Sequence, residues 1–134
     1  MRGPAVPDKP TRDEVRLAVP ATPEFLRLAR VTATGLASRL GFTFDEVEDL
    51  RLAIDELCYA LIGSKGRTGT VDLRYVVLGE ALEVEGVGNF EESVGDITLS
   101  ELSERILTAL VDEHDLAPSD GHPRFRLLTR RIGA

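Results

Sequence analysis

The 134-residue chain is 43% hydrophobic and 29% charged, a composition typical of one folded globular domain, which excludes a wholly disordered protein. Its net charge of −7 argues against direct nucleic-acid binding, because a negative protein repels phosphate backbones. One cysteine allows no internal disulfide, and no apolar run approaches the roughly 18 residues of a membrane span, so we expect a cytoplasmic protein without a membrane segment.

The N-terminal region has prolines at positions 4, 7 and 10 among small and polar residues. We interpret residues 1–13 as a flexible arm and residues 14–134 as a single domain. Apolar residues alternate over 15–19, which predicts a half-buried strand that Pro20 ends.

Two helices are predicted next. The first begins with a hydroxyl cap from Thr22 and with Pro23 in its first turn, and it ends at Gly41. The second begins at a capping box in which Thr43 and Glu46 each bond the other's backbone amide. The predicted buried face of the second helix consists of Val47, Leu50, Ile54, Leu57, Cys58 and Leu61.

The loop after the second helix, Gly-Ser-Lys-Gly-Arg-Thr-Gly over residues 63–69, contains the residue types of a phosphate-binding loop. Its order is wrong for that motif, and it leaves a helix and enters a strand, so no helix N-terminus would face a phosphate. We therefore interpret residues 63–69 as a flexible connector.

A hairpin follows the connector. Apolar residues alternate over 71–77, a turn is predicted at 78–81, and residues 82–85 form the returning strand. The glycine-containing stretch 86–89 and a polar loop come after it.

A third helix is predicted from a capping box of Thr98 and Glu101, and residues 124–132 are typical of a final strand. Two helices that lead into a hairpin favour an α+β fold, a two-layer sandwich in which helices pack on one face of a mixed, mostly antiparallel sheet. The predicted buried face of the third helix consists of Leu99, Leu102, Ile106, Ala109 and Leu110.

This element order, the segment Pro20–Glu24 and the segment Asp49–Cys58 (DLRLAIDELC) resemble the anti-sigma serine-kinase family of the histidine-kinase-like ATPases. The resemblance covers residues 15–131. It implies a histidine-kinase-like ATPase fold, with ATP held between a helix, a glycine turn and a mobile lid.

The resemblance also implies roles for five residues. Glu56 matches the acid that acts in the family as a general base near the phosphates or their Mg²⁺. Ala60 stands where the family has an Asn that coordinates Mg²⁺, and a methyl group cannot replace that ligand. Gly86 and Gly88 match the glycine turn, but Val84 replaces the Asp that accepts the adenine amino group, a loss of about 1–3 kcal/mol.

The other nucleotide elements of the family are also reduced. Residues 89–97 are all that remain for a lid, and no glycine lies between Gly95 and Gly121 to form the second glycine-rich box. We therefore interpret the nucleotide site as degenerate and expect no required cofactor.

Plainer interpretations stay open for the same residues. Glu56 lies with Ala53 and Ala60 on a strip predicted to be opposite the buried helix face, where an acid can simply face solvent. Gly86 and Gly88 can form a strand-ending turn without binding any ligand.

Other candidates are given structural interpretations. We interpret Cys58 as a buried, unreactive thiol. His114, predicted just after the third helix where a cation suits the helix dipole, and His122 lack metal-ligand partners at useful spacing, so we predict no metal site. A basic cluster is interpreted as the solvated face of the last strand and consists of Arg124, Arg126, Arg130 and Arg131.

The function predicted from these observations is protein binding without catalysis. The resemblance implies a homodimeric anti-sigma regulator that sequesters a sigma factor or engages an anti-anti-sigma-like protein. The rival is an ATP-dependent serine kinase with Glu56 as base and Mg²⁺ held by Glu56, phosphates and water. A third hypothesis is a fold relative that binds a small ligand other than ATP, and Mg·ATP binding separates the kinase from the other two.

Overall fold

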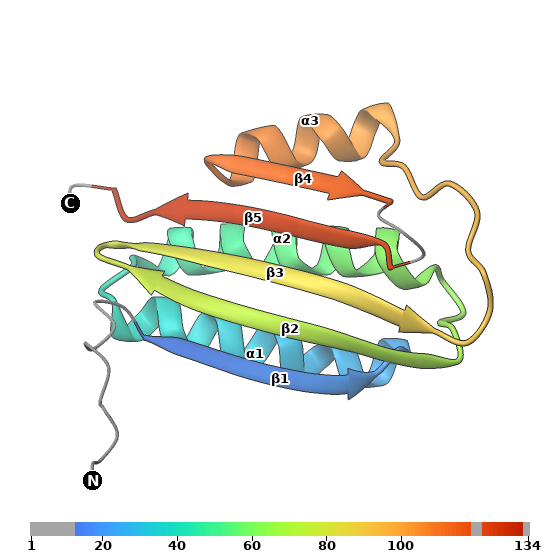
Figure 1. Ribbon diagram of the computed structural model, residues 1–134. Helices are drawn as coiled ribbons and strands as arrows, with labels where there is room; N and C mark the ends of the chain where they lie inside the picture. The colour runs from blue at the N-terminus through green and yellow to red at the C-terminus, as the bar shows by residue number, and fades with distance from the viewer. Residues whose placement is uncertain (1–12, 119–121, 133–134) are drawn as a thin grey trace, which may run out of the picture.

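The computed structural model describes residues 13–118 and 122–132 (Figure 1). The arm expected at residues 1–13 lies outside these residues except for Asp13. Within the described ranges, none of the helices combines the length and the apolar character that crossing a membrane requires. The elements in chain order are β1 (Glu14–Pro20), α1 (Pro23–Arg39), α2 (Phe44–Ile62), β2 (Gly69–Leu78), β3 (Ala81–Phe90), α3 (Glu101–Leu110), β4 (Glu113–Ala117) and β5 (Arg124–Arg130).

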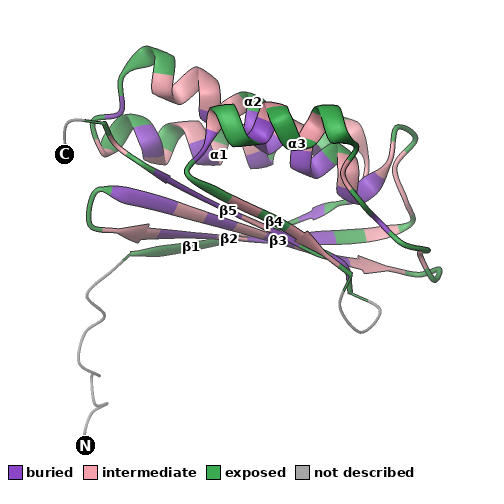
Figure 2. Cartoon of the chain, turned by 90° about the horizontal axis from the view of Figure 1, so that it is seen from above, coloured by how far each residue is buried: buried purple, intermediate pink, exposed green. Residues whose placement is uncertain are grey.

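The strands form one sheet in the order β1-β2-β3-β5-β4, and each neighbouring pair is antiparallel. All three helices lie on one face of this sheet, with α2 between α1 and α3, and the other face is bare in the described chain (Figures 1 and 2). The predicted α+β two-layer sandwich is therefore confirmed, with a sheet that is antiparallel throughout its described pairings.

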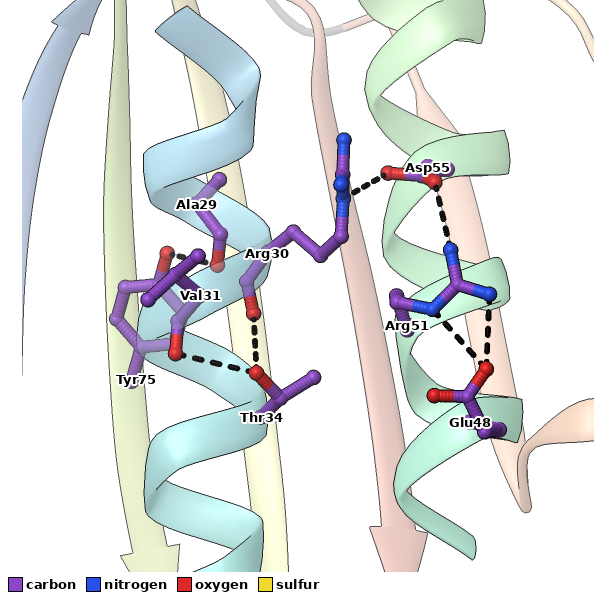
Figure 3. Close-up of polar contacts among 8 residues, drawn as sticks. All are labelled: Ala29, Arg30, Val31, Thr34, Glu48, Arg51, Asp55 and Tyr75. Carbon is purple, nitrogen blue, oxygen red and sulfur yellow. Dashed lines mark hydrogen bonds and ion pairs between the residues drawn. The ribbon is translucent and has the colours of Figure 1, made fainter. Parts of the chain in front are cut away.

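The core lies between the two layers, where Figure 2 shows the buried residues. In the sheet register, Val84 of β3 lies between Tyr75 of β2 and Leu127 of β5, and all three are 0% exposed. The Tyr75 hydroxyl crosses to the helical layer and donates to the carbonyl of Ala29 at 2.9 Å (Figure 3). This row of side chains fixes the centre of the sheet against the helices.

The two helix starts near the N-terminus differ from each other. The capping box of α2 is present, with Thr43 N donating to Glu46 at 2.7 Å and Glu46 N donating to the Thr43 hydroxyl at 3.2 Å. The hydroxyl cap predicted for α1 was wrong, because Thr22 makes no side-chain cap hydrogen bond. The backbone amide of Phe25, the third residue of α1, instead donates to the Thr22 carbonyl at 3.1 Å, and the buried Thr22 hydroxyl has no hydrogen-bond partner among the described residues.

The region after β3 differs most from the prediction. Helix α3 is capped by Ser100 and not by Thr98, and Leu102 is 67% exposed, whereas Leu107 is fully buried. Strand β4 was missed, because its five residues, Glu-His-Asp-Leu-Ala, are too short and polar to show an alternating pattern. His114 therefore lies in a strand and not at a helix end, and its Nε2 contacts Glu104 of α3 at 2.7 Å.

Candidate functional site

Glu56 lies on the side of α2 that faces α3. Its carboxylate oxygen Oε2 accepts a hydrogen bond from the hydroxyl of Ser103, in the first turn of α3. A pocket of about 300 Å³ surrounds this contact. The pocket is lined by Glu56, Tyr59, Ala60, Thr98, Leu99, Ser100 and Ser103.

The predicted strip on α2 divides between this pocket and the core. Glu56 and Ala60 are half-buried and line the pocket, but Ala53 is 0% exposed. The prediction that Ala53 lies opposite the buried face was therefore wrong, because α1, α3 and the sheet together cover more than one side of α2. Ala60 adds a methyl group one turn from Glu56 and no oxygen ligand.

Val84, Gly86 and Gly88 are not brought to the Glu56 pocket. Both glycines lie within β3, where Gly86 pairs with Leu73 and Gly88 pairs with Val71, so the predicted glycine turn is absent. Neither glycine is among those with a positive φ.

Aromatic rings explain why β3 carries glycines at these positions. A Cβ on Gly86 would overlap the ring of Phe125, which is fully buried, and a Cβ on Gly88 would overlap the ring of Phe90. The space beside the strand is thus filled by the chain's own side chains. Glycine is needed here for close packing and not for a turn.

The connector at residues 63–69 joins α2 to β2 and has a structural role. Gly66 has a φ of +79°, and a Cβ there would lie 2.8 Å from the carbonyl oxygen of Ala21. Arg67 bonds that carbonyl through its amide at 2.9 Å, and its guanidinium lies 5.4 Å from the ring centre of Phe90. The segment connects α2 to β2 as predicted, but these contacts tie it to the residues before α1 and to Phe90, so the expected flexibility is not supported.

Arginines of the basic cluster on β5 face the bare side of the sheet and are paired with acids. Arg126 contacts Glu83 at 2.6 Å and Glu113 at 3.1 Å, and Arg124 contacts Glu85 at 3.4 Å. The charges of Arg124 and Arg126 are therefore balanced locally, which agrees with a solvated strand face.

One ion pair links the outer surfaces of α1 and α2, and a second lies beside it within α2 (Figure 3). Arg30 of α1 contacts Asp55 of α2 at 3.1 Å, and Arg51 contacts Glu48 at 2.8 Å. The hydrogen bond from Arg51 is the main reason that the pKa of Glu48 is lowered. These charges are paired with each other and lie outside the Glu56 pocket.

Cys58 is buried on the core side of α2, as predicted. Burial is the main cause that raises the pKa of its thiol to about 12, and the negative charge of Asp55 adds to this effect. Across residues 13–118 and 122–132, no three His, Cys, Asp or Glu side chains gather as they would around a metal ion.

Sequence reasoning missed Ser100 and Ser103. The hydroxyl of Ser100 caps α3 by accepting from the amide of Ser103 at 3.0 Å. A serine followed by another serine three residues later is a weak N-cap signal. Nothing in the sequence indicates that the first turn of α3 packs beside Glu56, because that contact joins residues 47 positions apart.

Comparisons with known proteins give relatives named serine-protein kinase RsbW. No family model matches the chain. It is 29% identical over 133 residues to the serine-protein kinase RsbW of Bacillus pumilus, covering 83% of this chain and 82% of that protein. It is 38% identical over 79 residues to the serine-protein kinase RsbW of Bacillus subtilis, covering 57% of this chain and 49% of that protein.

A solved structure has the same fold. The crystal structure of the RsbU and RsbW domains of Rv1364c from Mycobacterium tuberculosis aligns with a TM-score of 0.66 and 14% sequence identity. The alignment covers 89% of this chain and 32% of that one. At 14% identity this structural likeness establishes the fold alone. The sequence match to the B. subtilis kinase spans about half of that kinase's length.

Proposed function

Since the chain is a homologue of the serine-protein kinases named RsbW, we propose that it is an anti-sigma-type regulator that works by binding a partner protein and has lost a competent ATP site. The observation that carries this proposal is the burial of Val84. The resemblance places an adenine-binding carboxylate at this position, and here it is an apolar side chain enclosed by Tyr75 and Leu127.

The surroundings of Glu56 also support a degenerate site. Mg²⁺ prefers several oxygen ligands, and the position where the resemblance places an oxygen ligand, one turn after Glu56, is the methyl group of Ala60. The glycines expected to approach the nucleotide are covered by the rings of Phe125 and Phe90. These residues do not fit Mg·ATP, and we derive no reaction step through it.

The kinase remains the second candidate function, because the relatives are named serine-protein kinases and because Glu56 is retained. In this alternative Glu56 is the general base for a serine of the partner. Mg²⁺ would then be held by Glu56, phosphate oxygens and water, since Mg²⁺ usually keeps several waters.

The expected partner is a sigma factor or an anti-anti-sigma-like protein, and we expect the regulator to act as a homodimer in the cytoplasm. A protein-binding function needs a stable surface and no phosphate site. The local pairing of Arg124 and Arg126 with acids supports a protein partner over nucleic acid.

The test combines nucleotide binding with partner binding. We expect calorimetric titration with Mg·ATP to give no heat at millimolar nucleotide, for the natural chain and equally for Ala60→Asn, which restores an oxygen ligand at an accessible position. The purified chain should retain a sigma factor or an anti-anti-sigma-like protein from the same cell, with dimer formation followed by sedimentation.

Two outcomes would reverse the proposal. Micromolar binding of Mg·ATP would favour the kinase, and transfer of the γ-phosphate to a partner serine that is lost in Glu56→Gln would establish it. Failure to bind any sigma factor or anti-anti-sigma-like protein, with no ATP binding, would favour the third hypothesis, a module for another ligand.

A further inference from the structure

Helix α3 is tied to α2 through the candidate site residue itself. The Ser103 hydroxyl donates to Oε2 of Glu56, and both residues line the pocket between the two helices. We propose that this contact is a latch: Ser103 occupies the Glu56 carboxylate and holds the first turn of α3 against it. A ligand that binds Oε2 of Glu56 then has to displace the Ser103 hydroxyl, which removes the tie that holds the first turn of α3. The inference rests on the proposed function in one respect, because it assumes that Glu56 is the residue of this site that contacts a ligand.

The direction of the hydrogen bonds supports the latch. The Ser100 hydroxyl donates to the Ser103 oxygen at 3.1 Å and accepts from the Ser103 amide at 3.0 Å. The Ser103 hydroxyl has a single proton, and this proton is directed to Glu56. A hydroxyl that donates to a carboxylate forms one of the stronger hydrogen bonds, and the preceding donor polarises it further.

The apolar packing of α3 is concentrated in its C-terminal half. Leu107 is its one fully buried residue among those the structure describes, Leu110 packs half-buried against the core, and Leu102 in the first turn is 67% exposed. The segment of residues 91–100, which leads from β3 to α3 along the outside of the molecule in Figure 1, has no regular secondary structure and contacts the core through Ile97 and Leu99. Because only one side chain of α3 is fully buried, its polar ties contribute substantially to holding the helix in position.

The second polar tie is weaker. The Glu104 carboxylate contacts His114 of β4, but the Glu104 side chain is 55% exposed, and exposed pairs of this kind contribute little. The Ser103–Glu56 contact is part-buried. Of the two, the contact at Glu56 therefore has the greater influence on whether α3 stays in place.

The latch also defines what competes with it. A cation or a ligand hydroxyl at Oε2 would take the position of the Ser103 oxygen. The ligand and Ser103 therefore cannot bind this side of the Glu56 carboxylate at the same time. Loss of the Ser103 hydrogen bond, which releases the first turn of α3, is therefore coupled to binding of a ligand at Oε2 of Glu56. Any ligand that prefers the open form shifts this equilibrium by its difference in affinity for the two forms.

Hydrogen–deuterium exchange of the intact chain tests the latch. We expect Ser103→Ala to raise the exchange rates of the α3 amides about 10- to 100-fold, because this is the effect of losing one hydrogen bond to a charged group. The exchange rates of α1 and α2 should not change. The matched control is Thr108→Ala, which removes a hydroxyl of the same helix that bonds only the Glu104 carbonyl one turn back, at 2.8 Å. This control should change α3 exchange by less than about threefold.

A double-mutant cycle tests whether the contact is direct. Ser103→Ala and Glu56→Ala should each release α3, and the double variant should release it no further than either single change. Unchanged α3 exchange in Ser103→Ala, or fully additive effects in the cycle, would overturn the latch. These measurements use neither nucleotide nor partner. The latch can therefore be disproved while the proposed function stands, and the proposed function can be disproved while the latch stands.

Discussion

At the scale of single residues, Val84 limits what the central strand can bind. The side chain is 0% exposed, and its cross-strand neighbours Tyr75 and Leu127 offer no positive charge. We predict that Val84→Asp lowers the free energy of unfolding at pH 7 by on the order of 4 kcal/mol, because an unpaired carboxylate would be buried in the core. Urea denaturation followed by circular dichroism measures this change.

The control for this variant lies three residues along the same strand. Val87 faces the bare side of the sheet, is half-buried and pairs with Asp72 and Arg124. Val87→Asp should change the free energy of unfolding by less than about 1 kcal/mol. If Val84→Asp proved as stable as Val87→Asp, space for a carboxylate would exist beside β3, and the main support for a degenerate site would be lost.

At the scale of whole elements, the two threonine N-caps provide a comparison within one protein. The Thr43 hydroxyl caps α2, whereas the Thr22 hydroxyl makes no cap hydrogen bond in α1. We predict that Thr43→Ala costs about 1 kcal/mol of stability and that Thr22→Ala costs less than half of this. Thermal unfolding of both variants measures the difference, and equal losses would contradict the assigned cap geometry.

Strand β3 gives a second prediction at this scale. Gly86 lies under the fully buried ring of Phe125, while Gly88 lies under Phe90, which is only half-buried at the end of the strand. Gly86→Ala should therefore destabilise the protein by about 1–3 kcal/mol, and Gly88→Ala should cost less because its ring has room to move. Chemical denaturation of the pair checks the order, and a larger loss for Gly88→Ala would show that Phe90 is as tightly held as Phe125.

Local signals in the sequence were enough to predict most elements. Alternating apolar residues located β1 and the hairpin, and the Thr43–Glu46 capping box located the start of α2. Strand β4 could not be predicted, because it is short, polar and stabilised by pairing with β5. The glycines of β3 were misread for a related reason, since the rings that require them come partly from β5, distant in the chain.

The candidate site was less predictable than the fold. Helical spacing placed Glu56 and Ala60 on one side of α2, and the structure places both in one pocket. The partner of Glu56 could not be foreseen, because Ser103 reaches it only through the way α3 packs on α2. Contacts that depend on tertiary packing of a weakly patterned helix leave no local signal in the sequence.

At the scale of the whole molecule, two buried ionisable groups, the Cys58 thiol and the Tyr75 hydroxyl, predict how the free energy of unfolding changes at alkaline pH. Burial raises the pKa of Cys58 from 9.0 to about 12, and it also raises the pKa of the Tyr75 hydroxyl. Because the folded pKa lies above the unfolded one, the contribution of Cys58 to stability is fully present below pH 9 and is lost as pH rises toward 12.

We predict that Cys58→Ala, compared by urea denaturation from pH 8 to pH 11, loses stability less steeply than the natural chain above pH 9. Equal slopes would mean that the thiol ionises without unfolding the core, and the native protein would then react with an alkylating agent at pH 9, where we expect reaction only after unfolding.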